Sequence, residues 1–214
     1  MLLKKGIELI VGPMFCGKTE ELLRRLRRLE IAREKVQLFK PKIDTRYSQN
    51  DVSTHYGLTM PGILVEDTKE LIKKYDSSVG VIGIDEIQFF DDEIIDFLLN
   101  NQNKHLFIAS GLPLNFRAEP FNFKNSDKHL GNLMPHTRPT YLDSICDTCG
   151  VGADFTQRLI NGKPAPYDSD LILVGGKEKD NKKDSYEARC LEHFYKPIKG
   201  ESNKFLVNNK IITL

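Results

Sequence analysis

The sequence lacks the features that would tie it to a membrane or to a polyanion. No apolar run approaches the roughly 20 residues that a bilayer-spanning helix needs. The formal net charge is only +1, which gives no sign of nucleic-acid or membrane binding through bulk electrostatics. The chain passes from Lys4 and Lys5 directly into an apolar run, so we expect no secretory signal peptide and a cytoplasmic location. It contains no internal repeats.

Cysteine is also scarce, with four in 214 residues. Cys146 and Cys149 form one Cys-x-x-Cys pair, and Cys190 stands three residues before His193. In a reducing compartment two such pairs predict a zinc site and not a disulfide framework. Because four protein ligands leave no open position, the zinc is expected to be structural. An incidental grouping of thiols or a redox Cys-x-x-Cys pair is the alternative.

The length allows one sizeable domain with a small satellite. Buried-type strands alternate with amphipathic helical segments, which predicts a parallel sheet. The expected strands are 7–11, 36–39, 63–65, 79–84 and 106–109, and the expected helices follow Thr19 and span 68–75 and 91–100. From Cys146 onward, short strands at 152–158 and 171–174 surround turn signals, which is typical of a zinc ribbon.

These patterns predict an α/β fold. We expect a P-loop NTPase-like, mostly parallel sheet flanked by helices, with a small zinc-ribbon-like β subdomain and a lid loop. The expected domains are an α/β nucleotide-binding domain at 1–142, the zinc-ribbon subdomain with its substrate-binding lid at 143–195, and a tail at 196–214. The charged run 177–184 is expected to be a solvated excursion, and 205–214 either a late strand or a disordered end.

One motif carries the clearest chemistry, a G-x-x-x-x-G-K-T segment between an apolar strand and a charged helix. Its residues, called the phosphate loop below, are Gly12, Pro13, Met14, Phe15, Cys16, Gly17, Lys18 and Thr19. In this context the backbone N–H groups and the helix N-terminus surround phosphate oxygens, Lys18 adds a positive charge, and Thr19 offers a hydroxyl to Mg²⁺. The sequence therefore predicts a nucleoside triphosphate site.

A second motif supports the first. The expected strand 79–84 ends in Asp85 and Glu86. One carboxylate after a buried strand can enter the Mg²⁺ shell, and its neighbour can accept or direct a proton. Because both strands are expected in one parallel sheet, their carboxyl ends meet at the same edge, where open α/β sheets bind ligands.

Read together, the motifs resemble the zinc-containing thymidine kinases, a family shared by cytosolic animal, bacterial and poxviral enzymes. The resemblance runs from about residue 6 to 195. Besides the phosphate loop and the two cysteine knuckles, which are 146–149 and 190–193, it rests on the segments at 44–48, 84–90, 111–112, 115–117, 120–121, 154–158 and 174–176, and on Tyr186. The chain departs from the family pattern at Cys16, Pro113 and His193 and in the length of the lid region.

The resemblance implies a homotetramer that uses ATP, Mg²⁺ and structural zinc to phosphorylate thymidine, with no nucleic-acid or membrane partner. It implies Glu86 as the general base, with Lys18 and Arg46 as further catalytic residues. Donor-side residues beyond the phosphate loop would be Asp44, Arg46, Asp85 and Gln88. Thymidine-side residues would be Met14, Leu112, Phe116, Phe121, Phe155, Thr156, Val174, Gly176 and Tyr186. Thr19 and Asp85 would serve Mg²⁺, and Cys146, Cys149, Cys190 and His193 would bind zinc.

Three other functions share parts of this pattern. A kinase with broader nucleoside substrates differs only in the pocket around the 5-methyl group. A zinc-ribbon P-loop NTPase that acts on nucleic acid predicts a basic surface, against which the net charge of +1 argues. A nucleotide-binding regulator without catalysis conflicts with the intact pair of Asp85 and Glu86.

Overall fold

The computed structural model describes residues 4–43, 51–53, 59–172 and 184–214, with side chains described outside 51–53. The chain divides into two compact units. Unit 1 comprises Met1–Val11, Lys18–Pro113 and Phe121–Tyr141, and unit 2 comprises Gly12–Gly17, Leu114–Pro120 and Leu142–Leu214. Each unit is therefore built from several separate segments. The domain boundaries expected from the sequence stay predictions.

Unit 1 is built on a six-stranded sheet in the order β5-β2-β6-β7-β1-β8. Every neighbouring pair in it is parallel. The strands are β1 (Gly6–Val11), β2 (Val36–Pro41), β5 (Ile63–Val65), β6 (Val81–Ile84), β7 (Leu106–Gly111) and β8 (Arg138–Tyr141). The sequence predicted five of the six, because strands buried on both faces, such as β6 and β7, read as continuous apolar runs, and the edge strand β5 is itself entirely apolar.

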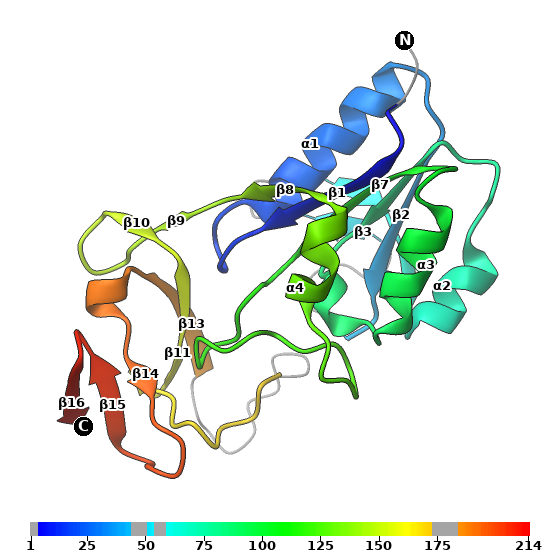
Figure 1. Cartoon of the computed structure of the whole chain (residues 1–214). Helices are drawn as coiled ribbons and strands as arrows, with labels where there is room; N and C mark the ends of the chain where they lie inside the picture. The colour runs from blue at the N-terminus through cyan, green and yellow to red at the C-terminus, as the bar shows by residue number, and fades with distance from the viewer. Residues whose placement is uncertain (1–3, 44–50, 54–58, 173–183) are drawn as a thin grey trace. The chain divides into compact units, whose positions relative to one another are not determined.

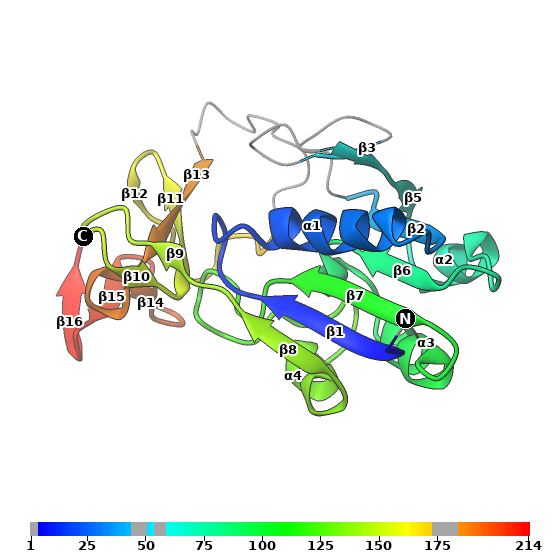
Figure 2. The same ribbon diagram turned by 90° about the horizontal axis from the view of Figure 1, so that it is seen from above.

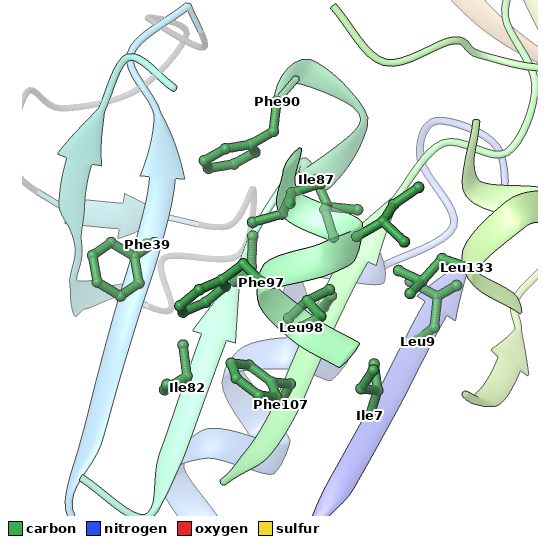
Figure 3. Packing of buried hydrophobic residues seen from close by; sticks show 14 of the residues in the cluster. Ile7, Leu9, Phe39, Ile82, Ile87, Phe90, Phe97, Leu98, Phe107 and Leu133 are labelled. Carbon is green, nitrogen blue, oxygen red and sulfur yellow. The ribbon is translucent and has the colours of Figure 1, made fainter. Parts of the chain in front are cut away.

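Helices cover both faces of this sheet. Figure 2 shows α1 (Lys18–Ile31) on one face and α3 (Glu93–Asn101) with α4 (Leu130–Leu133) on the other. The main apolar core fills the second face, where α3 contributes Phe97 and Leu98 and the strands contribute Phe39, Ile82 and Phe107 (Figure 3). The predicted α/β fold with helices on a parallel sheet is confirmed.

Gly83 sets the distance between α1 and the sheet. A Cβ atom at this position would lie 2.6 Å from Leu26 Cδ1 on α1 and 2.9 Å from Leu38 Cδ1 on β2. The glycine in the middle of β6 therefore lets the helix approach closely. Because α1 begins at Lys18, this approach also brings the start of the helix toward the carboxyl end of β6.

Several elements of unit 1 were not expected from the sequence. A short helix, α4, begins after His129, whose side chain accepts from Gly131 N–H at 3.0 Å. It leads through a 3₁₀ turn into the edge strand β8. The segment read as a polar loop includes a small antiparallel pair, β3 (Asp51–Ser53) and β4 (Thr59–Pro61).

The expected helix at 68–75 is present as α2 (Thr68–Lys74). It is capped by Asp67, which accepts from Glu70 N–H at 2.8 Å.

Unit 2 is built from small antiparallel sheets, coloured from yellow-green to red in Figure 1. Its strands are β9 (Ser144–Ile145), β10 (Gly152–Ala153), β11 (Phe155–Ile160), β12 (Lys163–Pro164), β13 (Asp184–Arg189), β14 (Lys196–Pro197), β15 (Lys204–Val207) and β16 (Lys210–Thr213). The end of the chain is thus a β hairpin added to β14, which decides between the two expectations for 205–214. Of the expected strand 171–174, Leu171 and Ile172 lie outside any strand, and the rest falls outside the described residues.

Across the described ranges, no helix is both long enough and apolar enough to cross a membrane.

Candidate active site

The phosphate loop joins β1 to α1 by a tight turn. Phe15 and Gly17 adopt left-handed backbone angles, with φ of 66° and 79°. A Cβ atom on Gly12 would lie 2.2 Å from the Leu142 carbonyl oxygen and 2.6 Å from Cys16 Sγ, so only glycine fits. Left-handed residues within a turn direct successive N–H groups into one concavity, which is a backbone site for anions. The next residue, Lys18, opens the 14-residue helix α1 and is 8% exposed.

A hydroxyl and a carboxylate meet at the carboxyl edge of the unit 1 sheet. Thr19 Oγ1 lies 3.2 and 3.3 Å from the two carboxylate oxygens of Asp85, which is 3% exposed. Ser110, at the end of the neighbouring strand β7, donates to Asp85 Oδ1 at 2.5 Å. Two adjacent oxygen ligands of an octahedral Mg²⁺ ion, each about 2.1 Å from the metal, stand about 3.0 Å apart. Thr19 and Asp85 therefore fit the pair of hard oxygen donors that this cation prefers.

Glu86 follows Asp85 in a strained backbone conformation. Its φ of 50° and ψ of 46° lie in the left-handed region, just before the 3₁₀ turn η1 (Ile87–Phe89). A non-glycine residue in this region costs about 1–3 kcal/mol, and such residues concentrate at functional sites. The Glu86 carboxylate accepts from Gln88 Nε2 at 2.6 Å. Gln88 Oε1 in turn accepts from the Leu112 N–H at 3.0 Å.

Unit 1 also holds two of the residues expected on the nucleoside side. Leu112 directly follows β7 and is 9% exposed. Phe121 is 7% exposed and packs edge-on against Phe89, with ring centroids 5.6 Å apart. Phe121 therefore contacts the same 3₁₀ turn that follows Glu86.

Lys40 is a basic residue of unit 1 that the sequence reasoning missed. It is 2% exposed and stands at the carboxyl end of β2. The Asp85 N–H donates to the Phe39 carbonyl at 2.9 Å, which places Lys40 beside Asp85 on the neighbouring strand. Because side chains alternate along a strand, Lys40 shares the α1 face with Leu38. The signal in the sequence was a lysine at the end of an apolar strand.

Four expected nucleoside-side residues gather on one face of the β11–β13 ladder in unit 2. The Met14 N–H donates to Thr156 Oγ1 on β11 at 3.0 Å. Tyr186 on β13 pairs with Arg158, which stands two residues after Thr156 on β11. Paired residues and residues two apart share a face of a sheet. The guanidinium of Arg158 lies 5.6 Å from the ring centroid of Phe116, which brings that ring to the same face.

Phe155 points to the other face of that ladder. Its ring stacks on Phe194, with centroids 4.7 Å apart and planes 17° from parallel. The Phe155 side chain therefore packs within unit 2. On the face of the ladder that carries Thr156, only the backbone of Phe155 is available.

The four expected zinc ligands come together in unit 2. The ligand atoms of Cys146, Cys149, Cys190 and His193 all lie within 4.8 Å of one another. Cys149 Sγ is 3.7 Å from Cys190 Sγ, and Cys190 Sγ is 3.3 Å from His193 Nδ1. Tetrahedral zinc with Zn–S bonds of about 2.3 Å separates its sulfur ligands by about 3.8 Å. The cluster therefore has the composition and the spacing of a Cys₃His zinc site.

The ionisation of these thiols also suits a metal. Burial raises the pKa of Cys146, but N–H groups of Cys190, Thr148 and Cys149 outweigh it and lower the pKa to about 6. For Cys149 the Val151 N–H opposes the change, yet burial and the neighbouring sulfurs raise its pKa. The cluster therefore favours a thiolate at Cys146 and disfavours one at Cys149, unless a cation neutralises their charges.

Four expected site residues fall outside the described residues: Asp44, Arg46, Val174 and Gly176. Most of the charged run 177–184 falls outside them as well. The described part of the expected site thus consists of the phosphate loop, the residues at the ends of β6 and β7, the β11–β13 ladder and the cysteine cluster.

Comparison with known proteins identifies the family of the chain. The family model described as thymidine kinase matches residues 5–194. The thymidine kinase of Mesoplasma florum is 46% identical over 191 residues, which cover 86% of this chain and 88% of that protein. Among solved structures, the Legionella pneumophila ATPase DotB matches with a TM-score of 0.41 and 12% identity, over 71% of this chain and 44% of that one. The family model and the identity to the Mesoplasma protein establish that this chain belongs to the thymidine kinase family and is a nucleoside kinase, a transferase.

Proposed function

We propose that this kinase transfers the γ-phosphoryl group of ATP to the 5′-hydroxyl of thymidine, giving dTMP and ADP. The observation that carries the proposal is the contact of Thr19 with Asp85 at 3.2 Å, with Glu86 as the next residue. The oxygen pair that we propose for Mg²⁺ thus stands directly beside a second carboxylate. Phosphoryl transfer requires little more from a protein than positioning and electrostatic stabilisation.

The donor phosphates bind in the phosphate loop in this proposal. Its inward N–H groups and the N-terminus of α1 attract the phosphate oxygens, and Lys18 adds a charge close to them. Thr19 and Asp85 would hold Mg²⁺, which would neutralise charge on the donor phosphates. Ser110 fixes the Asp85 carboxylate by donating to it at 2.5 Å. Asp44 and Arg46 are proposed to steady the transferred group.

Glu86 is proposed as the general base. Its carboxylate takes the proton from the 5′-hydroxyl as that oxygen bonds to the γ-phosphorus. The bond from the γ-phosphorus to the bridging oxygen breaks at the same time, and ADP leaves with the electron pair. The products are therefore dTMP and ADP, and the released proton resides on Glu86 until solvent removes it.

Thymidine is proposed to bind against the β11–β13 ladder. Phe116 stacks on the base, and Met14, Thr156 and Tyr186 surround it, supported by their gathering on one face of the ladder. Further residues proposed for the nucleoside are Leu112, Phe121, Phe155, Val174 and Gly176. An apolar pocket distinguishes thymidine from deoxyuridine by only about 1–3 kcal/mol, because the two differ by one methyl group.

The zinc ion is proposed to be structural. The Asp147 N–H donates to the Ala188 carbonyl at 2.9 Å, and the Ala188 N–H donates to Asp147 Oδ2 at 2.6 Å. These bonds join the first cysteine knuckle to β13, and Ala188 pairs with Thr156 on β11. A metal that locks the knuckles therefore also fixes the ladder that carries the proposed nucleoside contacts.

We further propose that the kinase is cytoplasmic, serves nucleotide salvage for DNA synthesis and forms a homotetramer. Membership of the thymidine kinase family supports all three. Light scattering should then give four times the chain mass of 24.5 kDa. A mass of one or two chains at assay concentrations would contradict the tetramer.

The decisive assay measures dTMP and ADP from purified protein with ATP, Mg²⁺ and a panel of deoxynucleosides, with and without single-stranded DNA. We expect dTMP and ADP in equal amounts and no effect of the DNA. Glu86→Gln should retain ATP binding and lower kcat by about 10²–10⁴-fold. Glu93→Gln, which alters an exposed glutamate at the start of α3, is the matched control. ATP hydrolysis that is independent of thymidine and stimulated by DNA would refute the kinase and favour a nucleic-acid-dependent NTPase.

A further inference from the structure

Gln88 lies in the 3₁₀ turn η1 and is only 1% exposed. Both ends of its side-chain amide are bonded to protein groups. Nε2 donates to Glu86 Oε2 at 2.6 Å, and Oε1 accepts from the Leu112 N–H at 3.0 Å. The first of these is a charge-assisted bond, which is shorter and stronger than a neutral one. Gln88 therefore forms a bridge between a carboxylate and a backbone amide.

The orientation of this amide follows from the chemistry of its partners. A backbone N–H only donates, so the Gln88 oxygen must face Leu112. The NH₂ group must then face the Glu86 carboxylate, which only accepts when it is ionised. An amide satisfies both partners at once, whereas a carboxylate or a thioether at this position satisfies at most one.

The surroundings of Gln88 leave its amide little freedom. A Cβ atom on Gly111 would lie 2.7 Å from Gln88 Oε1 and 2.9 Å from Ile87 Cγ2. The absence of a side chain at Gly111 is thus what gives the amide its place. A side chain that is buried and bonded at both ends keeps one rotamer, and it imposes that constraint on the group it contacts.

We infer that Gln88 is a positioning residue that holds the Glu86 carboxylate in one orientation and ties it to the backbone of Leu112. The inference rests on the proposed function, in which Glu86 accepts the proton of the 5′-hydroxyl. Without the Gln88 donor, the Glu86 carboxylate loses this bond, and a smaller share of its orientations is productive. Because Leu112 is a proposed nucleoside contact, the same bridge fixes the position of the Glu86 carboxylate relative to the loop that follows β7.

Steady-state kinetics of single and double variants test this inference. Gln88→Met should lower kcat by about 10- to 100-fold, the cost of misplacing a reacting group. The KM values for ATP and thymidine should stay within about twofold, because both ends of the buried Gln88 amide are bonded to protein groups, in place of the donor-side contact that the resemblance implies. In the Glu86→Gln background, measured over long single turnovers, adding Gln88→Met should cause no further loss. Two residues that act through one group are non-additive in this way.

Two further variants separate positioning from folding. Gln88→Glu keeps the shape and the acceptor for the Leu112 N–H but sets a second buried carboxylate against Glu86, so both kcat and the melting temperature should fall. Its kcat is therefore compared with that of the wild type at a temperature at which circular dichroism shows the variant fully folded. Gln37→Met is the matched control. The Gln37 amide also bridges two backbone groups, donating to Lys74 O at 2.8 Å and accepting from Asp76 N–H at 3.0 Å, at a position remote from Glu86. This control should leave kcat unchanged.

Three outcomes would overturn the inference. If Gln88→Met lowers turnover by the same factor in the wild-type background and in the Glu86→Gln background, Gln88 acts independently of the base. If Glu86→Gln is inactive while both Gln88 variants keep full turnover, the positioning role fails and the proposed function stands. If Glu86→Gln itself keeps wild-type turnover, the proposed base is wrong and the positioning role fails with it.

Discussion

Removal of zinc should unfold the strands β9, β10, β11 and β13 of unit 2 while the parallel sheet of unit 1 stays folded. The buried cluster around the ligands consists of Cys146, Ala153, Ala188 and Cys190, and two of these four residues are themselves ligands. Once the metal is gone, the two alanine methyl groups contribute about 1–2 kcal/mol of apolar burial. The Phe155–Phe194 stack adds about 0.5–1.5 kcal/mol.

A zinc ion bound by the four ligands would contribute far more than these contacts. Structural zinc sites in small domains bind with about 10 kcal/mol or more, and this binding energy is folding energy. The knuckles and the ladder are joined through Asp147 and Ala188, so the loss should extend to Thr156 on β11. The KM for thymidine should then rise more than the KM for ATP.

The assay combines metal analysis, limited proteolysis and thermal unfolding on protein before and after treatment with a strong chelator. New cleavage sites within 143–195 should appear together with the loss of zinc. Cys149→Ser should reproduce this behaviour, whereas Cys16→Ser, which alters a thiol outside the knuckles, should retain one zinc per chain. Protein that has lost its zinc but shows the same melting temperature and the same cleavage pattern would refute the reasoning.

Three further predictions concern single side chains. Ser110→Ala removes the hydroxyl that donates to the buried carboxylate of Asp85, and it should destabilise the protein by about 1–3 kcal/mol in urea unfolding and raise the Mg²⁺ concentration needed for half-maximal rate; an unchanged Mg²⁺ requirement would remove Ser110 from the metal site. Met14→Ala should raise the KM for thymidine by about tenfold and leave the KM for ATP within about twofold, because only the side chain is proposed to face the base; equal effects on both substrates would contradict this. The hydrogen bond from the Arg24 guanidinium lowers the pKa of Glu21 most, burial opposes this change, and Arg25 lowers the pKa further. The pKa of Glu21 falls from 4.5 to about 2 as a result. The stabilisation by Glu21 is therefore fully present above about pH 4.5 and lost as pH falls through about 2, so Glu21→Gln should cost about 1 kcal/mol or less at pH 7 and progressively less toward pH 2, by urea unfolding.

Local pattern predicted the main strands of unit 1 because strands buried on both faces read as apolar runs. The run at 79–84 became β6, and the run at 106–109 became β7 with two further residues. The edge strand β8 was missed, because its residues Arg138–Tyr141 are half polar and alternate in burial. The hairpin of β15 and β16 at the chain end was left undecided, since an alternating strand of four residues carries little signal.

The sequence by itself determined the identity of the chemistry. A glycine-rich loop before Lys18 and Thr19, two carboxylates after a buried strand, and two cysteine knuckles each require particular residue types at fixed spacing. Such requirements are written in the order of residues, so no structure was needed to predict a phosphate loop, the pair of Asp85 and Glu86, or the four zinc ligands.

Only the tertiary structure decided how these groups are held. Ser110 contacts Asp85, which lies 25 residues earlier in the sequence. Gln88 donates to Glu86 and accepts from the backbone N–H of Leu112, which lies 24 residues later. No sequence pattern marks either contact. Lys40 stands beside Asp85 because β2 and β6 are neighbours, although 45 residues separate the two in the printed sequence. Supporting contacts of this kind depend on strand order and on the close approach permitted by Gly83 and Gly111, and local spacing carries no information about either.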